Sequence, residues 1–96
     1  MLILKSLTVQ SMHGFGIAQH IGRLSQDVIQ VEEGSLYPAL QRMRQKGWIT
    51  AQWGRTPQNR RARYYALTPV GRRRLGEEES GFAALMKAIG RVMRPA

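Results

Sequence analysis

The chain has 96 residues, which is enough for one domain with a modest hydrophobic core and too few for two. Its 43% of hydrophobic residues is typical of a folded protein, and it has neither a cysteine nor an apolar run near the roughly 18 residues that cross a bilayer. We therefore expect no disulfide, thiolate metal site, membrane span or signal peptide, and a cytoplasmic location. Fifteen lysines and arginines against six acidic residues give a formal net charge of +9, which favours a polyanionic partner.

The basic residues concentrate in one part of the sequence. Between Gly34 and Gly76 there is no acidic residue, whereas ten basic ones occur: Arg42, Arg44, Lys46, Arg55, Arg60, Arg61, Arg63, Arg72, Arg73 and Arg74. Self-repulsion within such a block destabilises a folded chain unless a polyanion binds it. We interpret the block as a nucleic-acid-binding surface; the alternative is an ordinary solvated surface.

The first two predicted elements are helices over residues 1–8 and 14–24, with a break at residues 10–12 and a loop at residues 25–33. Apolar side chains on both helices recur at the spacing of a single helical face. We expect the buried faces to consist of Leu4, Leu7, Ile17, Ile21 and Leu24.

A third helix is predicted from about Gly34 to Gly47, because glycine tolerates the positive φ of a helix end. Leu36, Leu40 and Met43 recur at the spacing of its buried face. At about 100° per residue, the opposite face is polar, basic and of little bulk, which suits a helix that enters a DNA major groove. This exposed face holds Ser35, Pro38, Arg42 and Gln45, with Tyr37 on its border.

Two strands are predicted at residues 48–53 and 62–67, which are rich in aromatic and β-branched residues. The link between them, residues 54–61, combines turn-forming residues with positive charge. A basic hairpin that directly follows a basic helix is the arrangement of a winged helix-turn-helix, in which the hairpin is the wing.

The last helix is predicted from Thr68, a capping residue, and Pro69, which suits the first helical position, to about Met93. Its C-terminal half carries an apolar stripe made of Phe82, Leu85, Met86, Ile89, Val92 and Met93. A domain this small cannot cover the whole stripe, so we expect it to meet its copy on a second subunit; packing against its own domain is the alternative. Four glycines weaken this helix, which should therefore depend on a partner.

These elements predict a mainly α-helical protein with a small β-hairpin. A winged helix-turn-helix DNA-binding domain would occupy residues 1–67, and a C-terminal dimerisation helix residues 68–96.

No constellation of residues supports catalysis, a cofactor or a metal site, so we expect a protein that is not an enzyme. His13 and His20 lack the spacing and the companions of metal ligands, and His13 should cap or pack at the start of the second helix. The acidic residues 77–79 point around a helix and cannot converge for acid–base chemistry, so we expect them to pair with the arginines 72–74.

Four segments in the same order resemble the PadR family of transcriptional regulators. They are residues 12–17 (Met-His-Gly-Phe-Gly-Ile), 33–40 (Glu-Gly-Ser-Leu-Tyr-Pro-Ala-Leu), 61–65 (Arg-Ala-Arg-Tyr-Tyr) and 67–69 (Leu-Thr-Pro). The resemblance covers roughly residues 1–75, and the combination of segments is quite specific. The single C-terminal helix is similar to that of the smaller PadR subfamily, where it carries dimerisation. Family members usually have residues ahead of the first helix, which should therefore be about one turn shorter here, with a consequence for dimer strength.

The resemblance implies a bacterial repressor that binds a palindromic operator in double-stranded DNA as a homodimer. It implies that the third helix reads the major groove while the wing touches the backbone or the minor groove. Carried over by position, the DNA-binding residues are Ser35, Tyr37, Pro38 and Arg42 on the helix and Arg60, Arg61 and Arg63 on the wing, to which the exposed helix face adds Gln45.

The resemblance also implies a small aromatic or apolar effector as a candidate partner, held between the winged domain and the last helix. Four side chains are then open to two interpretations, core and hairpin packing or an effector cavity: Trp48, Trp53, Tyr64 and Tyr65. The alternative function is a winged-helix interaction module whose basic face binds RNA or an acidic protein.

Overall fold

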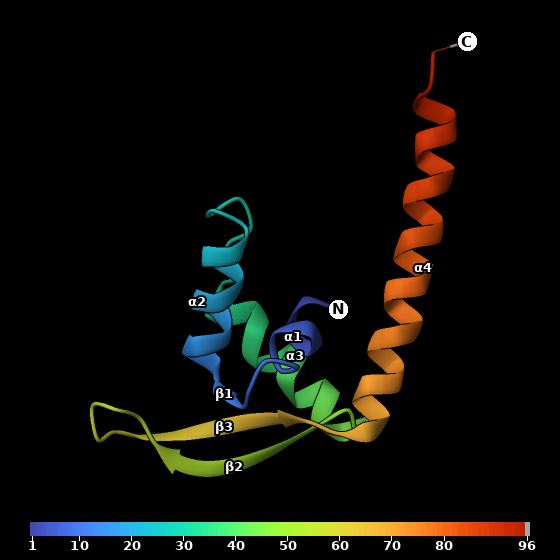
Figure 1. The fold of residues 1–96 in the computed structure, drawn as a ribbon. Coiled ribbons are helices and arrows are strands. Elements are labelled where there is room, and N and C mark those ends of the chain that lie inside the picture. The colour runs from blue at the N-terminus through green and yellow to red at the C-terminus, as the bar shows by residue number, and fades with distance from the viewer. Residues whose placement is uncertain (96) are drawn as a thin grey trace.

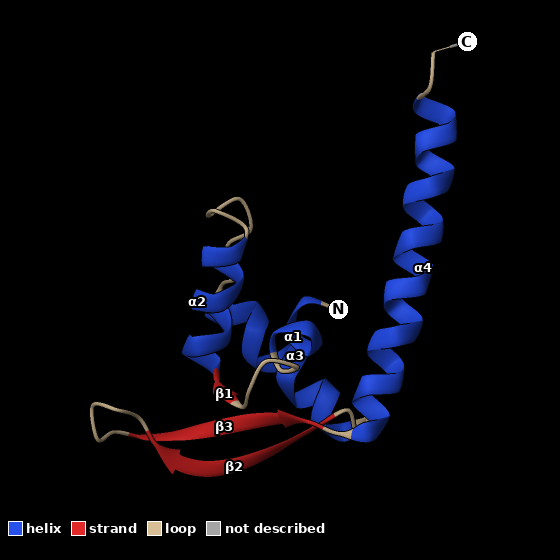
Figure 2. Cartoon of the chain, viewed as in Figure 1, coloured by secondary structure: helices blue, strands red, loops and turns tan. Residues whose placement is uncertain are grey.

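The computed structural model describes residues 1–95, which form four helices and a three-stranded sheet (Figures 1 and 2). In chain order the elements are α1 (Leu2–Ser6), β1 (Met12–His13), α2 (Gly14–Leu24), α3 (Glu33–Gln45), β2 (Ile49–Arg55), β3 (Arg61–Leu67) and α4 (Pro69–Met93). The prediction of a mainly helical protein with a small antiparallel hairpin is confirmed.

The sheet has the order β1-β3-β2 and is antiparallel throughout. Strands β2 and β3 pair from Ile49 opposite Leu67 out to Arg55 opposite Arg61, and this hairpin extends beyond the helices as the wing (Figure 1). The sequence predicted only a break where β1 lies. Two residues carry no alternation pattern, and β1 exists because Met12 pairs with Tyr65 of a distant strand.

The core lies where α1, α2 and α3 meet the inner part of the sheet. Its fully buried side chains are Leu4, Ile17, Leu36 and Leu40, all of them expected from helical periodicity. The prediction for Leu24 is wrong, because this side chain is 68% exposed. Leu24 continues the apolar spacing of α2, but it is the last residue of a helix whose end stands clear of the sheet (Figure 1).

Local signals set the helix ends as the sequence predicted. The Nδ1 atom of His13 accepts a hydrogen bond of 2.9 Å from the Gly16 N–H and caps α2. The hydroxyl of Thr68 accepts one of 3.0 Å from the Gly71 N–H and caps α4. Directly after α3, Gly47 adopts a φ of 76°, a conformation that favours glycine.

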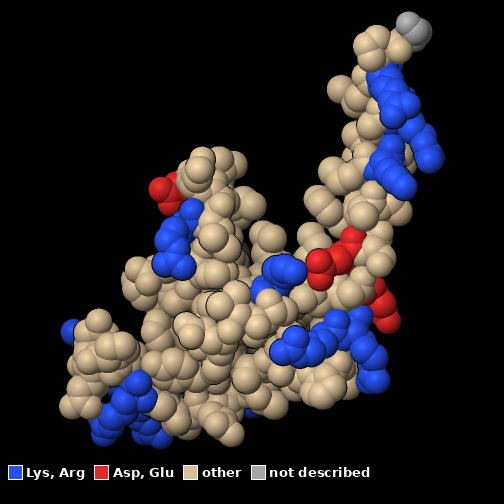
Figure 3. Space-filling view, in the orientation of Figure 1, with Lys and Arg blue, Asp and Glu red and all other residues tan. Residues whose placement is uncertain are grey.

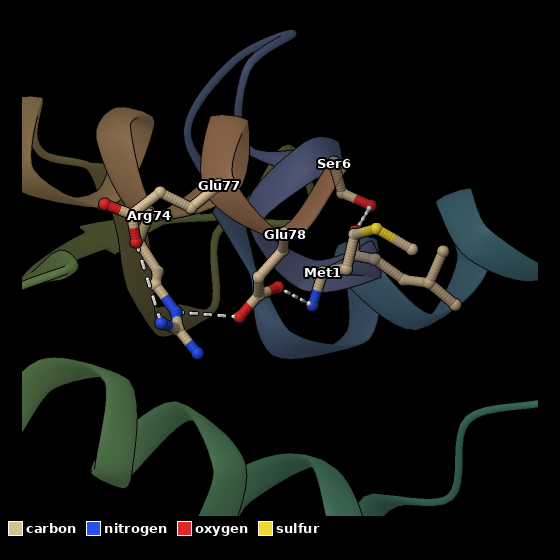
Figure 4. Close-up of polar contacts among 6 residues, drawn as sticks. Met1, Ser6, Arg74, Glu77 and Glu78 are labelled. Carbon is tan, nitrogen blue, oxygen red and sulfur yellow. Dashed lines mark hydrogen bonds and ion pairs between the residues drawn. The ribbon is translucent and has the colours of Figure 1, made fainter. Parts of the chain in front are cut away.

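Helix α4 is anchored to the rest of the molecule by its first turns. Leu75 is buried in the core. The Glu78 carboxylate forms two ion pairs of 3.0 Å, one with the Met1 amino group and one with Nε of Arg74 (Figure 4). Glu79 pairs with Lys5 of α1 at 3.6 Å.

The acidic residues 77–79 therefore find only part of their partners within α4. Arg74 pairs with Glu77 and Glu78, whereas Arg72 and Arg73 make no ion pair within residues 1–95. The prediction that all three arginines would pair with these acidic residues is wrong for Arg72 and Arg73, because the Met1 amino group and Lys5 of α1 supply the other partners.

Beyond its base, α4 stands away from the domain (Figure 1). The described chain measures 58 × 29 × 23 Å, and its radius of gyration of 15.6 Å exceeds the roughly 12.5 Å of a compact domain of this length. No residue from Gly76 onward is buried in the part of α4 that the structure describes. None of the helices within residues 1–95 combines the length and apolarity of a membrane span.

Candidate nucleic-acid interface

A cleft of about 830 Å³ lies between the start of α2, one face of α3 and the inner face of the wing. It brings together two groups of residues that the sequence assigned to DNA binding, Tyr37 from α3 and the wing arginines. Its lining also includes Arg44, which the sequence placed only within the basic block, and three residues that the sequence did not assign to DNA binding: Phe15, Gln41 and Trp53. We call this hollow the wing cleft.

The exposed face predicted on α3 lies beside the wing cleft. Its four members are solvent-accessible in the structure: Ser35, Pro38, Arg42 and Gln45. The cleft is lined instead by Tyr37, Gln41 and Arg44, which lie about a third of a turn around the same helix. Their i, i+4, i+7 spacing marks one face and was the available signal, but only the position of the wing shows that this face borders the cleft.

Tyr37 is held at the mouth of the cleft by the start of α2. Its side chain is 46% exposed, and its ring lies so close to Gly14 that a Cβ atom there would be 2.9 Å from Cε1 of the ring. A Cβ atom at position 14 would displace the ring from this contact. The present position of the Tyr37 ring therefore depends on the glycine at the start of α2.

The wing tip is an ordered turn. The Thr56 N–H donates to the Arg60 carbonyl at 2.8 Å, and the Asn59 N–H donates to the Thr56 carbonyl at 2.8 Å. Asn59 adopts a φ of 61°, a left-handed conformation that asparagine tolerates better than most residues. The Arg55 guanidinium donates to Asn59 at 3.3 Å across the turn. These hydrogen bonds order the backbone of the turn from which the side chains of Arg60 and Arg61 project.

Three of the four aromatic side chains pack as in an ordinary hairpin. Tyr65 is 6% exposed and belongs to the core, and Trp48 packs against the core beneath Lys46 and Arg74. The hydroxyl of Tyr64 donates to the Arg55 carbonyl at 3.1 Å.

Trp53 differs from the other three. It is 60% exposed on the wing, with the guanidinium carbon of Arg61 4.4 Å from its ring centre and that of Arg63 5.6 Å away. Cation–π contacts of this kind hold flexible arginine side chains in place.

The electrostatic character of the site is uniformly positive. Four arginines line the wing cleft, and its lining within the described chain includes no acidic residue. Figure 3 shows basic side chains at the wing tip and around the base of α4, whereas acidic ones gather just above that base. Residues 1–95 contain no group of three or more histidine, aspartate or glutamate side chains placed to hold a metal ion.

Three helices followed by a basic two-stranded wing define a winged helix-turn-helix protein. Residues 3–77 match the model of the transcriptional regulator PadR-like family. This match spans most of the chain, and the chain therefore belongs to the PadR-like family of transcriptional regulators.

Solved structures share the fold, and a curated relative matches most of the chain. A transcriptional regulator from Clostridium thermocellum superposes with a TM-score of 0.88 at 24% identity, covering 97% of this chain and 90% of that one. A PadR-like transcriptional regulator from Bacillus cereus superposes with a TM-score of 0.82 at 20% identity, covering 98% and 89%. The uncharacterized protein X of Lysinibacillus sphaericus is 27% identical over 88 residues, which are 92% of this chain and 81% of that protein.

Proposed function

We propose that this protein is a cytoplasmic repressor that binds a palindromic DNA operator as a homodimer and catalyses no reaction. The observation that carries the proposal is the convergence of α3 and the wing on one basic concave surface, the wing cleft. Such a surface raises the local concentration of a polyanion and fits a duplex better than a flat acidic partner.

The two parts of this surface suit different parts of a duplex. The exposed face of α3 has small residues, Ser35 and Pro38, near its N-terminal end and Arg42 one turn further. That profile lets the helix approach the base edges in a major groove, where an arginine can contact guanine. The wing presents Arg60 and Arg61, both exposed, to the adjoining backbone or minor groove.

The proposed dimer uses residues 68–96, and above all the apolar stripe of α4. All six side chains of this stripe are exposed in the single chain, from 43% for Ile89 to 82% for Val92. A contiguous apolar surface on a helix that leaves its own domain is stabilised by a second copy related by two-fold symmetry. Two winged domains would then face half-sites about one helical turn of DNA apart.

An effector remains a prediction from the family resemblance. Of the side chains considered for its cavity, Tyr65 and Trp48 are used in packing. The wing cleft is lined by residues of α2, α3 and the hairpin and by no residue of α4, so it is a different place from the predicted effector cavity between the winged domain and the last helix.

A gel shift with the promoter region upstream of the protein's own gene tests the proposal. We expect a sequence-dependent complex whose log K falls against log salt with a slope of roughly −5 to −9, since each subunit should neutralise about three to five phosphates. Equal binding to RNA, heparin and random DNA would instead support an interaction module. A slope shallower than about −2 would contradict the DNA-binding assignment.

Two arginine substitutions distinguish base-specific contacts from contacts with the DNA backbone. Arg42→Ala should weaken the binding free energy for the operator by about 1–3 kcal/mol and reduce the difference in affinity between operator and random DNA. The reason is that Arg42 lies on the side of α3 that is proposed to face the major groove. Arg61→Ala should weaken both complexes to a similar degree, because a wing contact to phosphate carries no sequence information. Equal loss of specificity in the two variants would contradict this division.

A further inference from the structure

Trp53 is the largest side chain in the wing, and core packing does not account for its position. It lies on β2 opposite Arg63 of β3, one same-face step from the pair formed by Arg55 and Arg61. Trp53, Arg61 and Arg63 all line the wing cleft. An apolar ring that is 60% exposed gains little from burial here, so its contacts with the two guanidinium groups are its main interaction.

Arg63 carries a second unusual feature. Its Nε atom is shielded from solvent, and no hydrogen-bond acceptor within residues 1–95 serves it. Buried donors are almost always paired, because an unpaired one loses its hydrogen bond to water and gains none in return. Because this atom is closed to water it is closed to a phosphate as well, and Arg63 would meet a ligand in the wing cleft through the terminal nitrogens of its guanidinium.

The chemistry of the cleft identifies the ligand class. Arg44, Arg60 and Arg61 line the same cleft as Arg63, and the phenol of Tyr37 adds a hydrogen-bonding hydroxyl. Planar guanidinium groups match the oxygens of a phosphate in a two-pronged geometry, and clustered cations require an anion between them. The cleft lies next to the exposed face of α3, where the strand that borders a major groove entered by this helix would pass.

We propose that Trp53 is a positioning residue, which holds Arg61 and Arg63 in the wing cleft for the backbone phosphate that the wing is proposed to meet. This inference rests on the proposed DNA-binding function and adds Trp53 to its residues. Ordering the two arginines before binding reduces the conformational entropy that each loses when it meets DNA. Trp53 itself does not touch the phosphate.

Salt titrations of operator binding distinguish the two roles. Arg63→Ala should lower affinity roughly tenfold on operator and random DNA alike and reduce the slope of log K against log salt by about 2 for a dimer, because one phosphate contact per subunit is lost. Trp53→Leu should lower affinity about three- to tenfold with the slope unchanged, because every charge remains. Trp53→Phe should recover part of that loss. Arg91→Ala, which removes the same charge from the exposed part of α4, is the control and should change neither quantity.

A spectroscopic measurement tests the geometry without an operator. In an NMR spectrum of the arginine Nε–Hε groups, stacking on Trp53 should shift the signals of Arg61 and Arg63, and Trp53→Leu should return both to the position of exposed arginines. Adding inorganic phosphate should move the Arg63 signal before that of Arg91, and a short duplex should do so at far lower concentration.

The outcomes separate this inference from the proposed function. Sequence-specific DNA binding that survives Arg63→Ala with its affinity and slope intact would overturn the phosphate contact of Arg63 and leave the repressor assignment standing. An Arg63 signal that responds to phosphate in a protein that binds no duplex would support that contact and overturn the proposed function. Wild-type affinity in Trp53→Leu would overturn the positioning role.

Discussion

Gly71 is the position where one methyl group should disturb this protein most. A Cβ atom there would overlap the carbonyl oxygen of Trp48 and lie 2.8 Å from Cδ1 of Leu67. The overlapped oxygen belongs to the backbone and cannot rotate away. Gly71→Ala must therefore push the first turn of α4 off the end of the hairpin.

The cost follows from the contacts at this junction. The Thr68 N–H donates to the Trp48 carbonyl at 3.0 Å, and the Thr68 hydroxyl lies 2.6 Å from the Gly47 carbonyl. Hydrogen bonds of this kind contribute about 1 kcal/mol each, and overpacking a tight contact costs roughly 1–3 kcal/mol. Alanine recovers up to about 1 kcal/mol through its helix propensity. The free energy of unfolding should fall by about 2–4 kcal/mol.

Gly76→Ala is the matched control on the same helix. Nothing lies within 4 Å of a Cβ atom at Gly76, so the same substitution should stabilise the protein by up to about 1 kcal/mol. Urea unfolding followed by circular dichroism measures both variants, at one protein concentration because dimerisation would shift the midpoint. With an m-value near 1 kcal/mol/M, the midpoint of Gly71→Ala should drop by about 2–4 M. Midpoints that move in the same direction for both variants would refute the close-approach reasoning.

Three further predictions concern the dimer, the α1–α4 contact and the first cap. Leu85→Glu should yield a folded monomer that no longer binds the operator, because a two-fold interface would bury two unpaired carboxylates. Light scattering measures the oligomeric state and a gel shift measures binding. A variant that stays dimeric would contradict the assignment of α4 as the dimer helix. The hydrogen bond from the Met1 amino group, aided by Arg74, holds the pKa of Glu78 below its ordinary range. The resulting stabilisation is present at neutral pH and is lost as the pH falls through the lowered pKa. Glu78→Gln should therefore be less stable than the wild type at pH 7 and equally stable in acid. Thermal unfolding at several pH values measures this difference. His13→Ala should lower the free energy of unfolding by about 0.5–2 kcal/mol through loss of the α2 cap, whereas His20→Ala should change it little; equal urea midpoints for the two would argue against the cap.

The amino-acid sequence by itself determined the elements and most of the core. Helix ends depend on one or two neighbouring residues, which is why His13, Gly47 and Thr68 marked them correctly. Buried faces repeat with the period of the helix, which is why Leu36 and Leu40 were found. The family was also accessible, because its segments are local runs in a fixed order.

The tertiary structure decided which surfaces come together, because a contact between distant segments has no local signal. Periodicity alone could not show that Leu24, which continues the apolar spacing of α2, lies beyond the part of the helix that the rest of the domain buries. Helix propensity counted Gly71 as a weakness, whereas the structure shows it as the place where α4 meets the backbone of Trp48. The wing cleft is the clearest case: Arg44 and Trp53 lie far apart in the sequence, and only the fold of the hairpin beside α3 sets the two side chains around one space.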